Sequence, residues 1–214
     1  INAAVEAIDP HRVGGVFGAV TKSASKCYNK GAVSFSGKSY RGLYVGGLGA
    51  YLPKVSQSYN KGAVTVKMSS VKKTEENKIG GVSGDTVDMR NCYNTGSVTV
   101  TGVAFVGGIS GYAHPWGEKV VNNYNTGKVK ASTKGAFKGQ VIGGYEGAEM
   151  SQKRNIYDNY YTGSGKAYGW GFVTWHKWVA KASKVSSIKA ASCSKYWTYS
   201  SKYGRMILKN NKEK

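Results

Sequence analysis

The sequence predicts an all-β fold, a parallel β-helix (β-solenoid) of about five coils with a C-terminal cap. Two short motifs alternate along the chain, and the stretches between them have the apolar patterns of short strands. Glycine is abundant at 30 of 214 residues and proline is scarce at 3, which favours many strands joined by turns. With 40% hydrophobic residues, the chain is too apolar for a disordered protein.

The first motif reads Tyr-Asn, then Lys or Thr, then Gly. Near copies begin at Tyr28, Tyr59, Tyr93 and Tyr124, and a weaker fifth copy begins at Tyr160. Alternating stretches such as 63–67 and 97–101 follow the motif, and this period of two predicts half-buried strands. A unit of this length cannot bury its own apolar face, whereas stacked copies can.

The second motif is a hydrophobic residue, two glycines and a second hydrophobic residue. Its copies lie at 13–16, 45–48, 79–82, 106–109 and 142–145. Asparagine and glycine supply turn geometry, with glycine free to adopt positive φ. The Gly-Gly segment suits a strand that bends at a corner or one that lies under a neighbouring coil. Stacking would align identical positions into an asparagine ladder and a tyrosine stack. The ladder would contain Asn29, Asn60, Asn94 and Asn125.

The repeats divide the chain into residues 1–163, predicted to be the solenoid, and 164–214, a basic and aromatic cap of the same domain. We expect polar insertions at 67–78 and 128–140, which are either surface loops or projections from a binding face. Trp197 is expected to plug the open end of the stack, because a solenoid must cover its terminal core.

The two motifs in this fixed order resemble the GLUG repeat, over about residues 13–163. That family occurs in large bacterial cell-surface proteins, including adhesin-like proteins and the non-catalytic repeats of M26-type IgA-cleaving metalloproteases. The resemblance implies an exported or surface-displayed β-helical module, and it implies no catalytic residue. The segment 197–209 also resembles the closing strand that follows such repeats, although Arg205 stands where proline is usual.

Three cysteines are present, and two of them, Cys27 and Cys92, occupy the position just before the repeated tyrosine, two repeats apart. Strands stack about 4.8 Å apart, so two coils separate these α-carbons by about 9.6 Å, beyond the roughly 7 Å that a disulfide spans. We therefore predict two free, buried thiols. Cys193 has no evident partner.

No motif of a known enzyme class appears, and the three histidines are far apart in sequence, so we predict no catalytic residue, no metal site and no cofactor. One catalytic alternative stays open, a glycan-degrading parallel β-helix enzyme. Its candidate residues would be Asp85, Asp88 and Arg90, which flank the third repeat. The plain structural alternative for Asp88 and Arg90 is a surface ion pair.

The formal net charge of +20 attracts anionic partners, although surface lysines also serve solubility and protect sheet edges. Half of this excess lies in residues 164–214, which contain eleven lysines and arginines and a single acidic residue, Glu213. Basic residues interleaved with aromatic ones bind anionic polymers, which makes this segment the first candidate binding site. The candidate ligand-binding residues are Trp175, Lys177, Trp178, Lys181 and Lys184.

These observations predict a non-catalytic β-solenoid module of a secreted or cell-surface bacterial protein, for adhesion or display. Its expected partner is an anionic glycan or a cell-wall polymer, and a host protein is the alternative partner. No apolar run is long enough to span a bilayer. Because the chain begins with Ile1 and not with Met, we expect it to be part of a longer protein. Within that protein we expect it to form a monomeric module.

Overall fold

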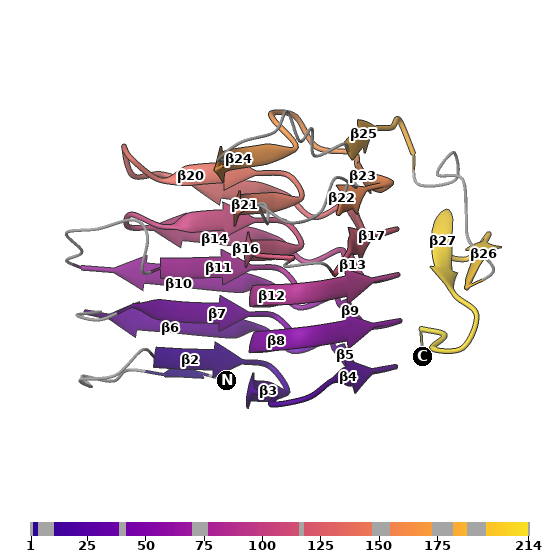
Figure 1. Cartoon of the computed structure of the whole chain (residues 1–214), viewed down its shortest axis with the longest axis horizontal. Coiled ribbons are helices and arrows are strands. Elements are labelled where there is room, and N and C mark those ends of the chain that lie inside the picture. Colours follow the sequence, from indigo (N-terminus) through magenta and orange to yellow (C-terminus); the bar gives the residue numbers. More distant parts are fainter. Residues whose placement is uncertain are drawn as a thin grey trace.

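A computed structural model describes residues 2–3, 11–38, 42–69, 77–115, 118–146, 155–172, 182–187 and 196–213. Within these ranges the chain forms strands and no helix, and it winds into a parallel β-solenoid, as predicted (Figure 1). The same ranges contain no helix with the length and apolarity needed to cross a membrane.

Two five-stranded parallel sheets form one side of each coil. Sheet A consists of β1 (Asn2–Ala3), β6 (Val33–Gly37), β10 (Val64–Met68), β14 (Val98–Thr101) and β19 (Val129–Ala131). Sheet B consists of β2 (His11–Gly14), β7 (Leu43–Gly46), β11 (Asn77–Gly80), β15 (Phe105–Gly107) and β20 (Phe137–Gly139).

Two further parallel sheets complete the coil, and an antiparallel hairpin follows. Sheet C consists of β3 (Phe17–Ala19), β4 (Ala24–Ser25), β8 (Gly49–Ser56), β12 (Ser83–Arg90), β16 (Ser110–Ala113), β17 (Val120–Val121), β21 (Ile142–Glu146), β22 (Ile156–Tyr157) and β24 (Tyr168–Phe172). Sheet D consists of β5 (Tyr28–Asn29), β9 (Tyr59–Asn60), β13 (Tyr93–Asn94), β18 (Tyr124–Asn125), β23 (Asn159–Tyr161) and β25 (Ala182–Lys184). The hairpin consists of β26 (Trp197–Ser200) and β27 (Arg205–Leu208).

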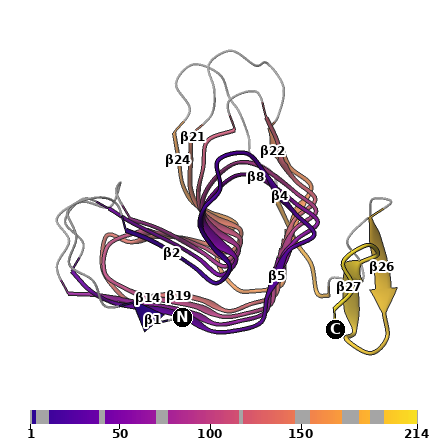
Figure 2. The ribbon, with the colours of Figure 1, turned by 90° about the horizontal axis from the view of Figure 1, so that it is seen from below.

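Successive coils stack in register, so equivalent residues of the repeats lie directly above one another. Seen along the stack, the coils superimpose, and each coil consists of two arms (Figure 2). Sheets A and B form the first arm, and sheet C curves around the second. With five strands in each of sheets A and B, the chain makes about four full turns between the first and the last strand. This is slightly fewer than the predicted number of coils.

Two elements differ from the predicted course of the chain. The stretch 128–140 is not an inserted loop, because it contains β19 and β20 and continues sheets A and B. In the other predicted insertion, residues 70–76 lie outside the described residues, while Asn77 and Lys78 belong to β11. Beyond residue 163, β24 and β25 add a further rung to sheets C and D.

The interior holds two separate hydrophobic cores. Inward-facing valines of sheets A and B, such as Val64 and Val106, form the first core. The second lies inside the arm formed by sheet C and includes Leu52, Met89 and Ile109. Period-two alternation buries these residues and leaves their neighbours outside, for example Val64 and Val66 inside with Lys67 exposed.

A ladder of buried asparagine side chains separates the two cores. The Asn94 Nδ2 donates hydrogen bonds to the Gly96 carbonyl (2.7 Å) and to Asn125 Oδ1 (2.9 Å). The Asn94 Oδ1 accepts from the Gly96 amide (3.2 Å) and from Asn60 Nδ2 (2.9 Å). An amide side chain has two donor hydrogens and two acceptor sites, so the hydrogen-bonding capacity of Asn94 is filled.

The paired glycines allow the opposite wall of the coil to approach this ladder. A β-carbon on Gly81 would collide with the amide group of Asn94, and one on Gly80 would collide with the Ser83 carbonyl. Neither glycine has a positive φ, so close approach rather than turn geometry explains the motif. The Gly-Gly segment thus lies against a neighbouring coil, which is one of the two roles expected for it, and none of the glycines in either motif has a positive φ.

Residues other than glycine form the left-handed corner of each coil. The positive φ values, between 47° and 57°, occur at the second residue before each repeated tyrosine. The residues in this position are Lys26, Gln57, Asn91, Asn122 and Asp158. Asn and Asp adopt this conformation more readily than other side-chain-bearing residues, which suits three of the five positions.

The repeated tyrosines form the predicted stack on the outer face of sheet D. The Tyr28, Tyr59, Tyr93 and Tyr124 rings lie 5.2, 4.7 and 4.9 Å apart in succession, each pair tilted by only 9°. Asparagine points inward from the next position, so each two-residue strand of sheet D presents one ring outside and one amide inside.

The preceding position contains the two cysteines, both of which are free as predicted. Cys92 is fully buried, and burial raises its thiol pKa to about 12. Cys27 is only half-buried, contrary to the prediction, because it belongs to the first coil of the stack. Burial raises the pKa of the Cys27 thiol as well.

Replacing Asn94 with alanine is expected to lower the free energy of unfolding by about 2–4 kcal/mol, because four hydrogen-bond partners lose their buried counterpart. Urea unfolding followed by circular dichroism measures the loss. The matched control is Asn29→Ala in the partly exposed first coil, which should cost about 1 kcal/mol or less. Equal losses would contradict a cooperative ladder.

In the native protein at pH 8, a small thiol reagent should modify Cys27 at least about a hundredfold faster than Cys92, since only thiolate reacts and Cys92 is buried. Peptide mapping by mass spectrometry separates these sites from Cys193. In denaturant the two rates should converge, and equal rates in the native protein would disprove the burial of Cys92.

Candidate functional sites

The structure describes only one of the predicted ligand-binding residues. Trp175, Lys177, Trp178 and Lys181 lie outside the described residues. Lys184 ends β25 at the edge of sheet D, where it is exposed and lies beside Tyr161 in register. The prediction of a C-terminal binding site therefore stays a prediction.

The C-terminal hairpin covers the tyrosine stack from the side. Trp197 is buried against Tyr93 and Tyr124, with ring centroids 5.9 and 5.2 Å away. Figures 1 and 2 show β26 and β27 beside the stack rather than across its end. The expectation that Trp197 plugs the open end of the solenoid is therefore wrong, because the outward-facing tyrosines offer it an apolar surface at the side.

A buried carboxylate anchors this hairpin. Glu213 accepts hydrogen bonds from Lys61 Nζ (2.8 Å), the Tyr93 hydroxyl (2.6 Å) and Arg205 (2.5 Å), and its side chain has no exposed surface. Burial opposes ionisation, but these donors outweigh it and lower the pKa of Glu213. The Tyr124 hydroxyl also donates to the Met206 carbonyl, so the hairpin is bound by polar contacts at two levels of the stack.

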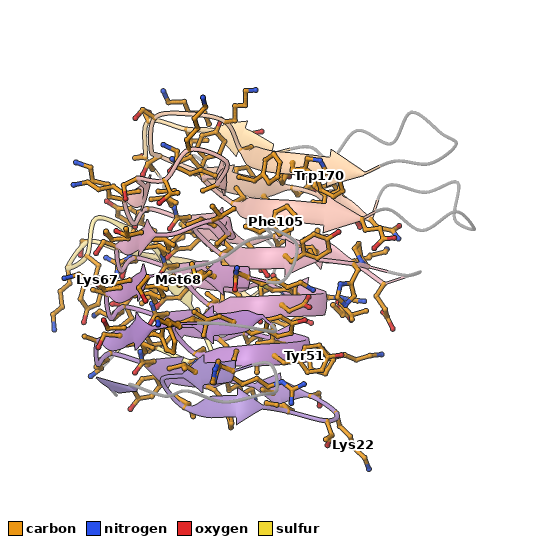
Figure 3. All side chains as sticks on the ribbon, turned by 90° about the vertical axis from the view of Figure 1, so that its left-hand side faces the viewer. Lys22, Tyr51, Lys67, Met68, Phe105 and Trp170 are labelled. Atoms are coloured by element: carbon orange, nitrogen blue, oxygen red, sulfur yellow. The ribbon has the colours of Figure 1, made fainter. Side chains whose placement is uncertain are left out.

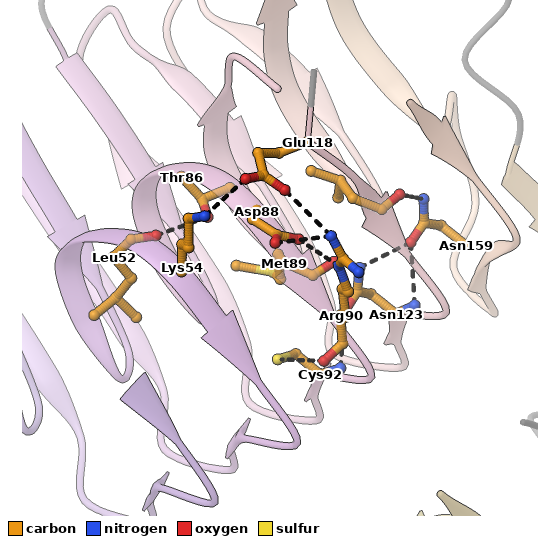
Figure 4. A network of polar contacts seen from close by, with 11 residues as sticks. Leu52, Lys54, Thr86, Asp88, Met89, Arg90, Cys92, Glu118, Asn123 and Asn159 are labelled. Carbon is orange, nitrogen blue, oxygen red and sulfur yellow. Dashed lines mark hydrogen bonds and ion pairs between the residues drawn. The ribbon is translucent and has the colours of Figure 1, made fainter. Parts of the chain in front are cut away.

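The outer face of sheet C contains a chain of ion pairs across three coils (Figure 4). Arg90 donates to both carboxylate oxygens of Asp88, at 2.6 and 2.9 Å, and it lies 3.3 Å from Glu118. Lys54 completes the chain by donating to Glu118 at 2.7 Å. The predicted surface pair of Asp88 and Arg90 is thus part of a larger network.

The two carboxyl groups of this network have opposite pKa shifts. Burial is the main cause that raises the pKa of Asp88, whereas the hydrogen bond from Lys54 lowers the pKa of Glu118. Unequal carboxyl groups side by side are used by acid–base enzymes. Here both carboxylates already bind cationic side chains of the protein, which is the arrangement of a structural ion-pair network.

A second cluster lies in the angle between sheets B and C. Asp85 is buried, lies 2.6 Å from Lys78 Nζ and 3.3 Å from His114 Nδ1, and Lys78 is close to the Tyr44 and Tyr112 rings. Burial lowers the pKa of His114. This imidazole is thus held neutral near physiological pH.

Aromatic rings continue this cluster up the stack. Phe105 packs against Tyr112 (5.0 Å), Phe137 (5.4 Å) and Trp170 (5.7 Å), and Figure 3 shows Phe105 and Trp170 on the same side of the molecule. Phe105 is almost fully buried by these neighbours. The rings therefore fill the angle between the sheets with their own contacts.

The residues of the catalytic alternative do not form one site. Asp85 pairs with Lys78 and His114, whereas Asp88 and Arg90 pair with each other and with Glu118. Within the described ranges, no group of three or more His, Cys, Asp or Glu side chains is arranged to hold a metal ion.

Comparison with protein-family models, with curated proteins and with solved structures finds no match for this chain. The resemblance to the GLUG repeat thus depends on the Tyr-Asn-x-Gly and Gly-Gly motifs themselves.

Sequence reasoning missed the partners of Glu118 and Glu213, because they are distant in sequence. Lys54 and Glu118 lie 64 residues apart, and Tyr93 and Glu213 lie 120 apart. One signal was present: Glu213 is the lone acid in a strongly basic segment, and such an acid is a candidate for a buried ion pair.

Glu213→Gln should weaken hairpin docking by about 1–3 kcal/mol at pH 7, because buried cations lose a charged partner. The pKa of Glu213 is lowered in the folded protein, so its ionised form stabilises docking. The stability difference between wild type and Glu213→Gln should therefore be complete above the ordinary glutamate pKa, and it should disappear as the pH falls through the pKa of the folded state. Tryptophan fluorescence during urea titration at several pH values follows the docking, with Trp197 as one of the five tryptophans that contribute to the signal.

The control is Lys212→Gln, at the adjacent exposed position, which should leave docking nearly unchanged. A wild-type advantage that persists undiminished at pH 2 would contradict the ionised anchor.

Proposed function

We propose that this chain is a non-catalytic β-solenoid module of a secreted or cell-surface bacterial protein, used for adhesion or display, and that it contacts an anionic glycan or cell-wall polymer. The stacked coils provide a rigid body with in-register side chains on every face. The resemblance to the GLUG repeat supports the surface location.

One observation carries the proposed electrostatic mechanism: four of the six acidic residues that the structure describes form ion pairs with cationic side chains of the chain itself. Asp85, Asp88, Glu118 and Glu213 are each engaged in an ion pair with a cationic side chain of the chain itself. Many lysines are exposed. They include Lys22, Lys26, Lys38, Lys67, Lys119, Lys128, Lys130, Lys134, Lys138, Lys166, Lys184, Lys202, Lys209 and Lys212. The external field is therefore positive, which favours a polyanionic partner.

The same pairing supports a non-catalytic role. An acid–base enzyme needs a carboxyl group directed at its substrate, and these four are directed at lysine, arginine or histidine. A polysaccharide turnover that disappears in Asp88→Ala would overturn this part of the proposal.

Retention on immobilised heparin and on teichoic acid should fall steeply with salt. Between about 10 and 150 mM, the screening length shrinks from roughly 30 to 8 Å, and we expect affinity to fall at least about tenfold. Affinity chromatography at stepped salt concentrations measures this, with neutral dextran as the control.

Retention that is unchanged by salt would contradict the electrostatic mechanism. Salt-independent capture of a host serum protein, without retention on either polyanion, would favour the host-protein alternative.

A further inference from the structure

The outer face of sheet A differs from the other outer faces of the solenoid. The hairpin covers the tyrosine face of sheet D except in the first coil, where Tyr28 is exposed, and aromatic rings line the angle between sheets B and C. The charges on the outer face of sheet C are paired with one another. On the outer face of sheet A, by contrast, Lys67 and Lys130 are exposed, and the described strands of this sheet contain no acidic residue.

The side chains on this face are fixed by alternation. Val64 and Val66 of β10 face the core, so Thr65 and Lys67 face outward. Parallel register aligns the outward residues of neighbouring strands into rows. One row contains Ser34, Thr65, Thr99 and Lys130, and a second contains Ser36, Lys67 and Thr101. Successive rungs of a row lie about 4.8 Å apart.

The chemistry of the face is uniform. The described outward side chains are hydroxyls and ammonium groups, and the described strands of sheet A contain no acidic residue. More lysines surround the face, at its margins and in the adjoining turns. The exposed lysines of the face and its surroundings are Lys30, Lys38, Lys67, Lys128, Lys130 and Lys134. Figure 3 shows Lys67 apart from the ring cluster of Phe105 and Trp170.

We infer that the outer face of sheet A binds a linear anionic glycan, with lysines on its carboxylate or sulfate groups and the Ser and Thr hydroxyls on its sugar hydroxyls. This inference deepens the proposed function and depends on it. A glycan fits better than a nucleic acid, because single-stranded nucleic acids are bound by stacking on aromatic rings. The only aromatic residue in the described strands of sheet A, Phe35, is buried inward.

A charge-reversal triple variant tests the surface: Lys67→Glu, Lys128→Glu and Lys130→Glu in the full chain. The matched control is Lys22→Glu, Lys166→Glu and Lys209→Glu, which reverses three exposed lysines elsewhere. Heparin affinity by calorimetry at 150 mM salt should fall at least about tenfold in the first variant and at most about threefold in the control. Unfolding midpoints in urea show whether both variants fold.

A second variant removes hydroxyls and leaves charge intact. The double change Thr65→Val and Thr99→Val retains strand propensity and should weaken heparin binding by about three- to tenfold. This readout keeps the inference testable if the triple variant fails to fold.

The outcomes separate the two proposals. Equal losses in the two triple variants, or unchanged binding in the Thr→Val variant, would place the binding elsewhere and leave the proposed function standing. Absence of heparin binding by the unmodified chain would overturn both. Equal affinity for single-stranded DNA of matched charge, with the same loss on charge reversal, would overturn the assignment to a glycan.

Discussion

The asparagine ladder joins the two walls of four successive coils. Each amide arises at the turn from sheet D to sheet A, and it lies against the paired glycines at the turn from sheet B to sheet C. A buried amide that lacked partners would cost several kcal/mol, and here Asn60 and Asn94 are each completed by asparagines of the coils above and below. The ladder therefore imposes register on the stack, because a shifted coil would leave amide groups unpaired.

The ladder also explains why the interior has two cores. Amide and glycine backbone meet across the middle of the coil, so valines of sheets A and B pack on one side and residues such as Leu52 and Met89 on the other. The two sequence motifs are thus partners in one contact. Their alternation along the chain reflects two sides of the same coil.

Acidic and basic side chains occupy different kinds of position in the structure. Asp85 is enclosed between two sheets, Glu213 beneath the hairpin, and Asp88 and Glu118 lie in a network across three coils. Lysines, by contrast, occupy turns and outward positions, where a long flexible side chain keeps its charge in water. Exposed lysines therefore outnumber exposed acidic side chains among the described residues, and sheet A presents the most regular array of them.

The spacing of Tyr-Asn-x-Gly and Gly-Gly was sufficient by itself to determine the solenoid, the asparagine ladder and the tyrosine stack, because identical residues in parallel register must lie above one another. The left-handed corners escaped prediction, since Lys26 and Gln57 have no intrinsic preference for that geometry and adopt it under the constraint of stacking. Only the tertiary structure placed Trp197 against Tyr93 and Tyr124, paired Glu213 with Lys61, and separated Asp85 from Asp88. The contacts of Trp197 and Glu213 join the C-terminal hairpin segment to coils far away in the sequence, and a local sequence pattern does not specify such contacts.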